Sequence, residues 1–442
     1  MSRESIEKYS IRYAVLKIIA RLWHSKIFYR KIIVIGKENI NPDDYLIIAP
    51  NHQNALMDAL AVLFTMKGQP VFLARADIFR KKFIASLLYF LKILPVYRIR
   101  DGFSTLKDNE QIFEKTIDVL KHKNGLVILP EGSHEGVRRL RQLKKGICRI
   151  AFQAAEAFDY NIKLKIIPVG IEFSHYYRIR QVLTVVYGKP IDVSEYYNSY
   201  RNNPTKAIND LRERLSSEMK KIMVHIEPAE DYEAIDELRN IINGKYHDSI
   251  KKPKLFRDRE LIERLNILRN TSPELYRKIC NLSLEIKKLT KKLNIDYRLL
   301  ERKNLTLSAL ITGIMALLLS FPLFLYGVIF NFIFYIIPDI VRKKFKDKQF
   351  YSSVIYTLSL FLAMLFLPVY LILLLIFVSP WWLAVASFVT IPLAGIFAWN
   401  YRIFFHRMIS RWKINHYIRQ KNSDFIRLRE YFNELFSLYN SL

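Results

Sequence analysis

Apolar runs of strand length alternate with amphipathic stretches over the first 200 residues of the chain. The runs are rich in β-branched and aromatic residues, and glycine or Asn-Pro-Asp turn chemistry separates the first of them. They cover residues 32–35, 45–49, 70–74, 94–99, 125–129, 163–171 and 182–187. Helical periodicity fills residues 55–66, 79–91, 108–122 and 146–158. The alternation predicts an α/β fold, a mixed sheet flanked by helices.

Further helices are predicted on either side of this α/β domain, which we bound at residues 29–200. Within residues 1–28, apolar side chains recur every three or four positions with basic residues between them. This pattern indicates a helix that either lies on a membrane surface or covers the following domain. Residues 201–303 are mainly helical, and Ser272-Pro273 marks a helix start. The apolar seam that follows predicts a helical hairpin with the preceding segment; its residues are Leu275, Ile279, Leu282, Ile286, Leu289 and Leu293.

Two long stretches near the C-terminus carry no charged residue: residues 305–337 and 351–401. A membrane-spanning helix needs about 20 apolar residues. Two hairpins, the first kinked or re-entrant at Pro322, would place all the basic flanks on one side of a membrane, as the positive-inside tendency prefers. A single crossing by the first stretch would instead place the basic linker opposite the N-terminal domain. We therefore expect an integral membrane protein with a membrane domain at residues 304–401, a basic helical tail at residues 402–442 and the α/β domain on the cytoplasmic side.

The charge balance narrows the class of partner. The chain has 69 Lys and Arg against 41 Asp and Glu, a formal net charge of +28, which implies an anionic partner. The uncharged stretches favour a lipid membrane, and no nucleic-acid-binding motif accompanies the charge, so we expect no nucleic acid. Cys148 and Cys280 lack metal-ligand spacing, which argues against a disulfide framework and a metal site. A cleaved signal peptide is not expected, because Arg12, Lys17 and Arg21 interrupt the apolar run near the N-terminus.

One boundary between strand, loop and helix carries candidate acid–base chemistry. His52 follows the apolar run Leu46 to Pro50, and Asp58 lies at the start of a helix-favouring segment. Imidazole is suited to taking a proton near neutral pH, and a carboxylate beside it can fix its tautomer. His52 is therefore a candidate general base and Asp58 its partner; a surface histidine near an aspartate at a helix N-terminus is the alternative. Positions six apart on a helix cannot meet, so we expect His52 in the loop, Asn54 as the N-cap and Asp58 in the first turn.

Two later strand ends carry groups suited to a phosphorylated polyol. Arg98 and Arg100 project to the same side of an emerging strand, and two guanidinium groups suit a phosphate. Glu131, Gly132 and Ser133 follow a buried strand, and open α/β sheets place ligand sites at this carboxyl edge. The glutamate and the backbone at the glycine are suited to hydroxyls and phosphate oxygens. A solvated strand end and a plain turn are the alternatives at the two places.

The order of these motifs resembles that of the phospholipid/glycerol acyltransferase family, which includes glycerol-3-phosphate and lysophosphatidate acyltransferases. The resemblance spans residues 29–192 and rests on residues 51–58, 95–98, 129–133, 167–169 and 188–190. It implies a glycerolipid acyltransferase-like fold and transfer of a fatty acyl group from an acyl-CoA or acyl-ACP thioester to a glycerol-phosphate acceptor. The thioester donor is then a co-substrate, no cofactor is needed, and acyl carrier protein is a partner where it carries the donor. The implied site residues are His52 as base, Asp58 as its partner, and Arg98, Glu131, Gly132 and Ser133 as acceptor ligands.

The chain departs from the family pattern at two places. Five residues rather than the usual four separate the histidine from the aspartate, and His134 stands where the family usually has a basic residue. Arg138, Arg139 or Lys144 would then supply the phosphate contact. The longer spacer resembles a branch that includes the fungal glycerol-3-phosphate/dihydroxyacetone-phosphate acyltransferases, which also carry C-terminal membrane segments. We therefore expect a glycerol-3-phosphate or dihydroxyacetone-phosphate O-acyltransferase of phospholipid biosynthesis. A lysophosphatidate acyltransferase and an inactive membrane scaffold on the same fold are the alternatives.

Overall fold

The computed structural model describes residues 5–96, 106–300 and 306–441. The chain forms two compact units. The first, which we call the α/β unit, comprises Met1–His225 together with the short segment Asp347–Ser353. The second, which we call the helical unit, comprises Ile226–Lys346 and Val354–Leu442. The α/β unit is thus larger than the domain predicted at residues 29–200.

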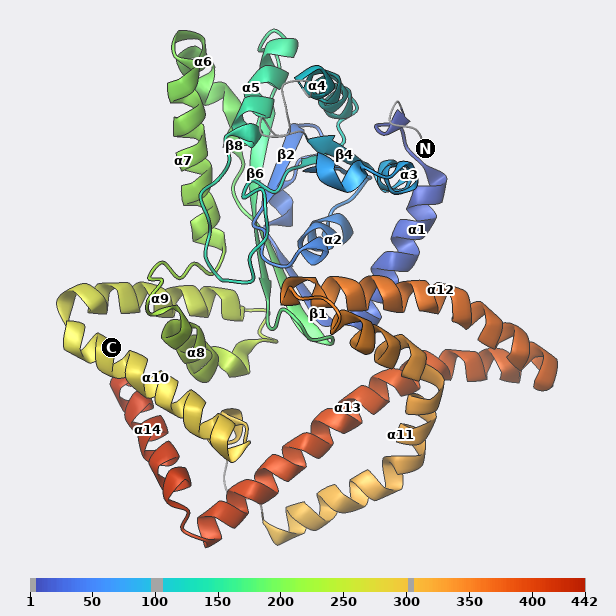
Figure 1. Cartoon of the computed structure of the whole chain (residues 1–442), viewed down its shortest axis with the longest axis vertical. Coiled ribbons are helices and arrows are strands. Elements are labelled where there is room, and N and C mark those ends of the chain that lie inside the picture. Colours follow the sequence, from blue (N-terminus) through green and yellow to red (C-terminus); the bar gives the residue numbers. More distant parts are fainter. Residues whose placement is uncertain (1–4, 97–105, 301–305, 442) are drawn as a thin grey trace. The chain divides into compact units, whose positions relative to one another are not determined.

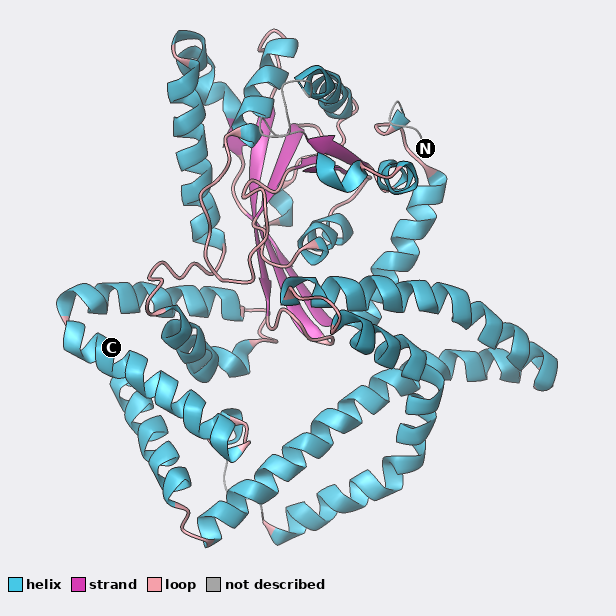
Figure 2. Ribbon diagram, viewed as in Figure 1, coloured by secondary structure: helices cyan, strands magenta, loops and turns pink. Residues whose placement is uncertain are grey.

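One mixed sheet forms the centre of the α/β unit (Figures 1 and 2). Within the described residues its strands are β1 (Tyr29–Ile35), β2 (Tyr45–Pro50), β3 (Val71–Arg75), β4 (Ile93–Val96), β5 (Leu126–Val127), β6 (Leu164–Phe173), β7 (Gln181–Tyr187) and β8 (Ile191–Asp192). They lie in the order β1-β7-β6-β2-β5-β3-β4, with β8 paired to β6. β7 and β8 run antiparallel to β6, and the other pairs are parallel. The predicted mixed sheet is confirmed. The strand predicted at residues 94–99 ends at Val96, and the rest of that prediction lies outside the described residues.

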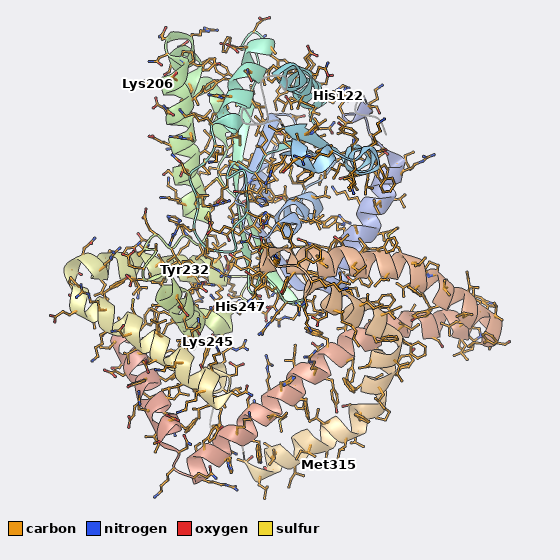
Figure 3. All side chains as sticks on the ribbon, viewed as in Figure 1. His122, Lys206, Tyr232, Lys245, His247 and Met315 are labelled. Atoms are coloured by element: carbon orange, nitrogen blue, oxygen red, sulfur yellow. The ribbon has the colours of Figure 1, made fainter. Side chains whose placement is uncertain are left out.

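Helices cover both faces of this sheet. They are α1 (Ile11–Leu22), α2 (Leu56–Thr65), α3 (Lys82–Phe90), α4 (Leu106–Lys121), α5 (Gly146–Ala157), α6 (Tyr197–Asn202) and α7 (Pro204–Ile222). A π-helical turn at Trp23–Phe28 leads from α1 into β1. The Asn203 side chain accepts the N–H of Lys206 at 3.0 Å and so caps α7, whose first turn is marked by the Lys206 label in Figure 3.

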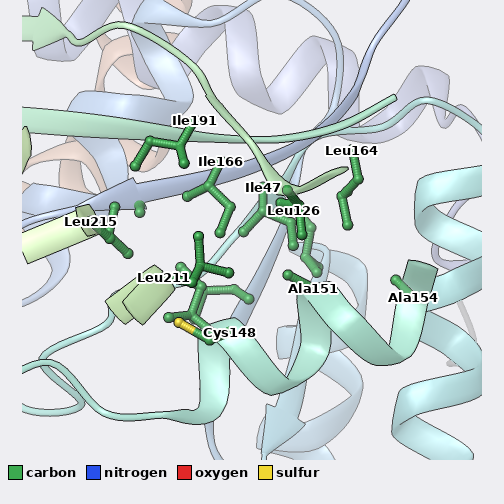
Figure 4. Packing of buried hydrophobic residues seen from close by; sticks show 14 of the residues in the cluster. Ile47, Leu126, Cys148, Ala151, Ala154, Leu164, Ile166, Ile191, Leu211 and Leu215 are labelled. Atoms are coloured by element: carbon green, nitrogen blue, oxygen red, sulfur yellow. The ribbon is translucent and has the colours of Figure 1, made fainter. Parts of the chain in front are cut away.

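The main hydrophobic core lies between the sheet and helices α4, α5 and α7. Figure 4 shows part of it: Ile47, Leu126 and Ile166 from the strands share the core with Cys148 of α5 and Leu211 of α7. Helix α2 contacts β2 and β7 on the opposite face. Because β2 and β5 are parallel neighbours, the loops that follow them meet at one edge of the sheet. This edge carries the candidate site.

The helical unit contains a bundle built around α10. Its described helices outside the apolar region are α8 (Tyr232–Asn243), α9 (Lys254–Thr271), α10 (Pro273–Leu293) and α14 (Ser423–Asn440). Ser272 alone joins α9 to α10, so the predicted helical hairpin is confirmed. α10 also packs against α8 and α14, and its predicted seam is buried from Ile279 onwards. The seam therefore has more partners than one hairpin neighbour, which is typical of a bundle rather than a free coiled coil.

Three described helices are long and apolar enough to cross a membrane: α11 (Leu307–Arg342), α12 (Tyr351–Phe377) and α13 (Trp381–Arg419). The second uncharged stretch forms the predicted pair of helices, α12 and the first part of α13. The first stretch forms one helix, α11, that continues through Pro322 and Pro338, rather than two helices joined by a turn. Figure 1 shows that α11 is strongly bent. A proline removes one backbone donor and bends a helix, but the turns on either side keep their hydrogen bonds, so the helix continues.

Candidate active site

His52 and Asp58 lie together at the carboxyl end of β2. The strand ends at Pro50 and α2 begins at Leu56, so His52 lies in the loop between them, as predicted. His52 Nδ1 is 2.9 Å from Asp58 Oδ2. The aspartate is fully buried in the first turn of α2, whereas 16% of the imidazole surface is exposed. With Nδ1–H donating to the carboxylate, Nε2 carries the lone pair and can accept a proton.

The extra spacer residue is accommodated in non-helical backbone. Asp58 Oδ2 also accepts the N–H groups of Gln53 at 2.8 Å and of Asn54 at 2.6 Å, which fixes the carboxylate. Ala55 has φ +45°, in the left-handed region, and it directly precedes α2. Ala55 is thus the N-cap residue, and the prediction of Asn54 at that place is wrong. The Asn54 side chain is used elsewhere, since its amide nitrogen donates to the Tyr176 carbonyl at 3.3 Å.

Buried polar side chains tie the His52 loop to β6 and to the segment after it. Asn51 Oδ1 accepts the N–H of Ile171 at 2.6 Å, and its amide donates to the carbonyl of the same residue at 3.2 Å. Gln53 Oε1 accepts the Tyr176 hydroxyl at 2.6 Å. Hydrogen-bonded polar side chains in a low-dielectric interior hold their neighbours rigidly. The loop therefore presents His52 from a fixed backbone.

Glu131 joins the loop after β5 to the His52 loop. Its Oε1 accepts the His52 N–H at 2.7 Å, and its Oε2 accepts the N–H and Nε–H of Arg141 at 3.1 and 3.2 Å. Burial raises the pKa of the Glu131 carboxyl, while these hydrogen bonds and the Arg141 charge act in the opposite direction. Both carboxyl oxygens serve N–H groups of the protein. The geometry thus favours support of the His52 main chain over the predicted contact between Glu131 and acceptor hydroxyls.

A polar rim beside Glu131 is formed by Ser133, Arg141 and Lys144. Arg141 Nη1 donates to Ser133 Oγ at 2.9 Å, and the N–H of Lys144 donates to the Pro130 carbonyl at 2.8 Å. Gly132 has φ +71°, and a Cβ there would lie 3.3 Å from Lys144 Cγ, so a side chain would strain the turn. Sequence reasoning missed Arg141. Three arginines close together, at positions 138, 139 and 141, indicated that one of them could lie near the site. The sequence does not show which arginine side chain points toward Glu131 and Ser133.

The Arg138 side chain is bound to residues outside the polar rim. Its Nε donates to Glu172 Oε1 at 2.7 Å and its Nη2 to the Phe173 carbonyl at 2.9 Å, and its guanidinium lies 4.6 Å from the Tyr176 ring centroid. Of the residues predicted to replace the missing basic contact, the structure therefore favours Lys144 over Arg138. The predicted phosphate ligands Arg98 and Arg100 lie outside the described residues.

His134 packs against the catalytic histidine candidate. The two rings meet edge to face with centroids 5.2 Å apart, and the Phe350 ring also meets His134 edge to face, with centroids 4.9 Å apart. Burial, followed by the nearby His52, lowers the pKa of His134, although the Asp347 and Asp58 carboxylates oppose this. A neutral imidazole does not supply the positive charge that a basic residue would bring to a phosphate. His134 therefore acts as packing beside His52.

Metal-ligating side chains do not gather in the described part of the chain: no group of three or more His, Cys, Asp or Glu is placed to hold a metal ion there. Cys148 and Cys280 are both buried free thiols. Neither lies in the candidate site.

Residues 31–172 match the family model described as Acyltransferase. Two curated yeast proteins (Saccharomyces cerevisiae) are similar to the chain. Glycerol-3-phosphate O-acyltransferase 2 is 27% identical over 129 residues, 29% of this chain and 17% of the relative. Glycerol-3-phosphate O-acyltransferase 1 is 22% identical over 167 residues, 37% of this chain and 22% of the relative. The chain thus matches less than a quarter of the length of either relative.

A solved structure also resembles part of the chain. The crystal structure of the 1-acyl-sn-glycerophosphate (LPA) acyltransferase from Thermotoga maritima is 19% identical, and the match covers 50% of this chain and 83% of that chain with a TM-score of 0.34.

Proposed function

We propose that this chain, whose residues 31–172 match the family model described as Acyltransferase, is a membrane-bound O-acyltransferase of phospholipid biosynthesis. It moves a fatty acyl group from acyl-CoA or acyl-ACP to a hydroxyl of glycerol-3-phosphate or dihydroxyacetone phosphate. The observation that carries the proposal is the contact of 2.9 Å between His52 Nδ1 and Asp58 Oδ2 at the carboxyl edge of the sheet. The similarity to two yeast glycerol-3-phosphate O-acyltransferases supports glycerol-3-phosphate as acceptor.

In this proposal His52 is the general base. Its Nε2 takes the proton of the acceptor hydroxyl while the hydroxyl oxygen attacks the thioester carbonyl carbon. Asp58 stabilises the imidazolium that forms. The tetrahedral intermediate then collapses, the carbon–sulfur bond breaks, and the thiolate takes the proton back from His52. The acceptor attacks the thioester directly, so no covalent acyl-enzyme is needed.

The acceptor phosphate binds at the polar rim in this proposal. Arg141 and Lys144 supply positive charge beside the Ser133 hydroxyl, and charge-assisted hydrogen bonds to phosphate are stronger than neutral ones. Arg98 and Arg100 stay proposed phosphate ligands, since two guanidinium groups on one side of a strand suit the same anion.

The proposed reaction takes place at a lipid membrane. The support is the length and apolarity of α11, α12 and α13 and the formal net charge of +28, which favours anionic headgroups. The basic flanks of the apolar stretches place the α/β unit on the cytoplasmic side in this proposal.

The proposal is tested with the full chain purified in detergent and assayed with labelled acyl-CoA and acyl-ACP. Glycerol-3-phosphate, dihydroxyacetone phosphate and lysophosphatidate are compared as acceptors. His52→Ala should lower kcat by at least about 10²-fold, because general base catalysis is typically worth about 10² to 10⁴. The matched control is His122→Ala. His122 is labelled in Figure 3, is exposed, and contacts the Asp118 carbonyl at 2.8 Å.

The control should keep wild-type activity. No transfer from either donor to any acceptor would favour the inactive scaffold. A preference for lysophosphatidate would replace the proposed acceptor, and full activity of His52→Ala would remove His52 from the mechanism.

A further inference from the structure

A short segment between two apolar helices is part of the α/β unit. Residues Asp347–Ser353 lie between α11 and α12. They include the short 3₁₀ turn Lys348–Phe350 and the first three residues of α12. They belong to the compact unit that holds His52, whereas the chain immediately before and after them belongs to the helical unit. The segment is separated from the His52 loop by almost 300 positions.

Ser352 is hydrogen-bonded to the loop that holds Asp58. Its hydroxyl donates to Asn54 Oδ1 at 2.7 Å, and both residues are buried. The N–H of Asn54 donates in turn to Asp58 Oδ2 at 2.6 Å, and that oxygen contacts His52 Nδ1. A continuous set of hydrogen bonds therefore runs from Ser352 to the imidazole. Loss of the hydroxyl would leave the Asn54 oxygen without this donor in a buried place.

Gln349 and Phe350 contact His134, which is not part of the hydrogen-bonded path from Ser352. The Phe350 ring meets His134 edge to face with centroids 4.9 Å apart. With its amide oriented so that the oxygen accepts the Gly136 N–H at 3.0 Å, the Gln349 nitrogen donates to the His134 carbonyl and to its Nε2, both at 3.3 Å. His134 in turn packs on His52. The segment thus reaches the histidine by a second, independent route.

We propose that this segment completes the active site, with Ser352 as a positioning residue for the His52–Asp58 pair and Gln349 and Phe350 as the residues that hold His134 against it. The inference rests on the proposed acyl transfer for its chemistry and on the contacts alone for its geometry. Its consequence is that the membrane region supplies residues that the α/β sequence lacks.

The placement of the segment against the α/β unit is tested by an engineered disulfide, a test that does not depend on enzymatic activity. A Cβ at Gly136 would lie 3.4 Å from Gln349 Cγ, and 2.7 Å from the Tyr177 hydroxyl, which must move aside at the far end of its side chain. The Cγ of Gln349 marks where the sulfur of a cysteine would lie, and in a disulfide each Cβ is about 3 Å from the sulfur of the other cysteine. Gly136→Cys with Gln349→Cys in the full chain should therefore cross-link under mild oxidation and change mobility on a gel. The control pair, Gly136→Cys with Lys348→Cys, uses the exposed neighbouring residue and should cross-link much more slowly. No cross-link, or equal rates for both pairs, would overturn the inference.

The positioning role is tested by kinetics with a matched pair of serines. Ser352→Ala should lower kcat about tenfold and leave the acceptor KM within about twofold, because the loss of one buried hydrogen bond moves the His52–Asp58 pair and not the acceptor site. Ser352→Thr keeps a hydroxyl and should recover most of the activity. Ser353→Ala is the control: Ser353 is also buried, and its hydroxyl has no hydrogen-bond partner among the described residues. Its activity should stay unchanged.

The two proposals fail in different ways. A cross-link in a chain without acyl transfer would keep the placement of the segment and remove the proposed function. Transfer that depends on His52 but is the same in Ser352→Ala as in wild type would keep the function and overturn the positioning role.

Discussion

The loop that carries His52 is held by buried side chains that accept backbone N–H groups. Asp58 accepts those of Gln53 and Asn54, and Glu131 accepts that of His52 itself. The two carboxylates therefore act alike. Asp58 fixes backbone and the His52 side chain, and Glu131 fixes backbone and the Arg141 side chain. Charge-assisted hydrogen bonds of this kind are shorter and stronger than neutral ones. The position of the imidazole depends on them directly.

Glu131→Gln should lower kcat about tenfold and leave the acceptor KM nearly unchanged. The amide keeps one oxygen acceptor but turns an NH₂ group toward an N–H donor, and the loss of a hydrogen bond to a charged group typically costs about 1.5–3 kcal/mol. Steady-state kinetics over a range of glycerol-3-phosphate concentrations measure both constants. Lys144→Ala is the contrasting variant and should raise KM with kcat preserved. A rise in KM alone for Glu131→Gln would restore the predicted contact between Glu131 and the acceptor.

Helices α11 and α13 pack closely through small residues. A Cβ at Gly327 would lie 2.2 Å from the Ala394 carbonyl oxygen, so only glycine fits this approach. Asn331 strengthens the contact, because its amide nitrogen donates to the Gly327 carbonyl at 2.9 Å and to the Ile391 carbonyl at 2.8 Å. Small residues and interhelical hydrogen bonds are the means by which helices associate in lipid, where hydrophobicity offers little. The pairing of α11 with α13 is thus specific to these positions.

Gly327→Leu should destabilise the helical unit, because the added side chain forces the two backbones apart. Overpacking of this kind typically costs about 1–3 kcal/mol. Thermal unfolding in detergent measures the change as a lower Tm. Ala316→Leu in the same helix is the control, since Ala316 is exposed and the larger side chain would face detergent. Equal Tm values for the two variants would contradict the close contact at Gly327.

The path of the whole chain limits how α11 can meet a membrane. No described helix between the end of the α/β unit at His225 and the start of α11 at Leu307 is long and apolar enough to cross. The segment that follows α11, Asp347–Ser353, belongs to the same α/β unit. We therefore predict that α11 enters and leaves a membrane on the same side. The bend of α11 in Figure 1 is of the kind that this path requires.

A cysteine at position 346 should be inaccessible to a membrane-impermeant maleimide added to intact cells, whereas one at position 379 should be labelled. Lys346 lies next to the segment that belongs to the α/β unit, and Ser379 lies at the far end of α12. α12 has 27 residues, and at about 1.5 Å per residue it is long enough to cross a bilayer. Labelling of permeabilised cells is the positive control. Labelling at position 346 from outside would contradict both this topology and the cytoplasmic side proposed for the α/β unit.

Local sequence patterns were sufficient to predict most helices and strands and the candidate pair His52 and Asp58. The apolar runs predicted strands because side chains alternate across a sheet, and the six-residue separation of His52 and Asp58 required a loop before the helix. Short-range geometry of this kind is encoded by the residues that adopt it. The N-cap was one exception: Asn54 has a suitable side chain, but Tyr176 and Ser352, both distant in sequence, form hydrogen bonds with it.

The sequence by itself determined the order of strands and helices, the uncharged stretches and the histidine–aspartate pair. Only the tertiary structure decided that Glu131 faces the His52 backbone, that Arg141 and not Arg138 turns toward Ser133, and that Ser352 reaches Asn54. These contacts join residues from 8 to 298 positions apart. Which side chains meet in these contacts depends on how the loops pack at the edge of the sheet. The spacing of the residues along the chain does not show this.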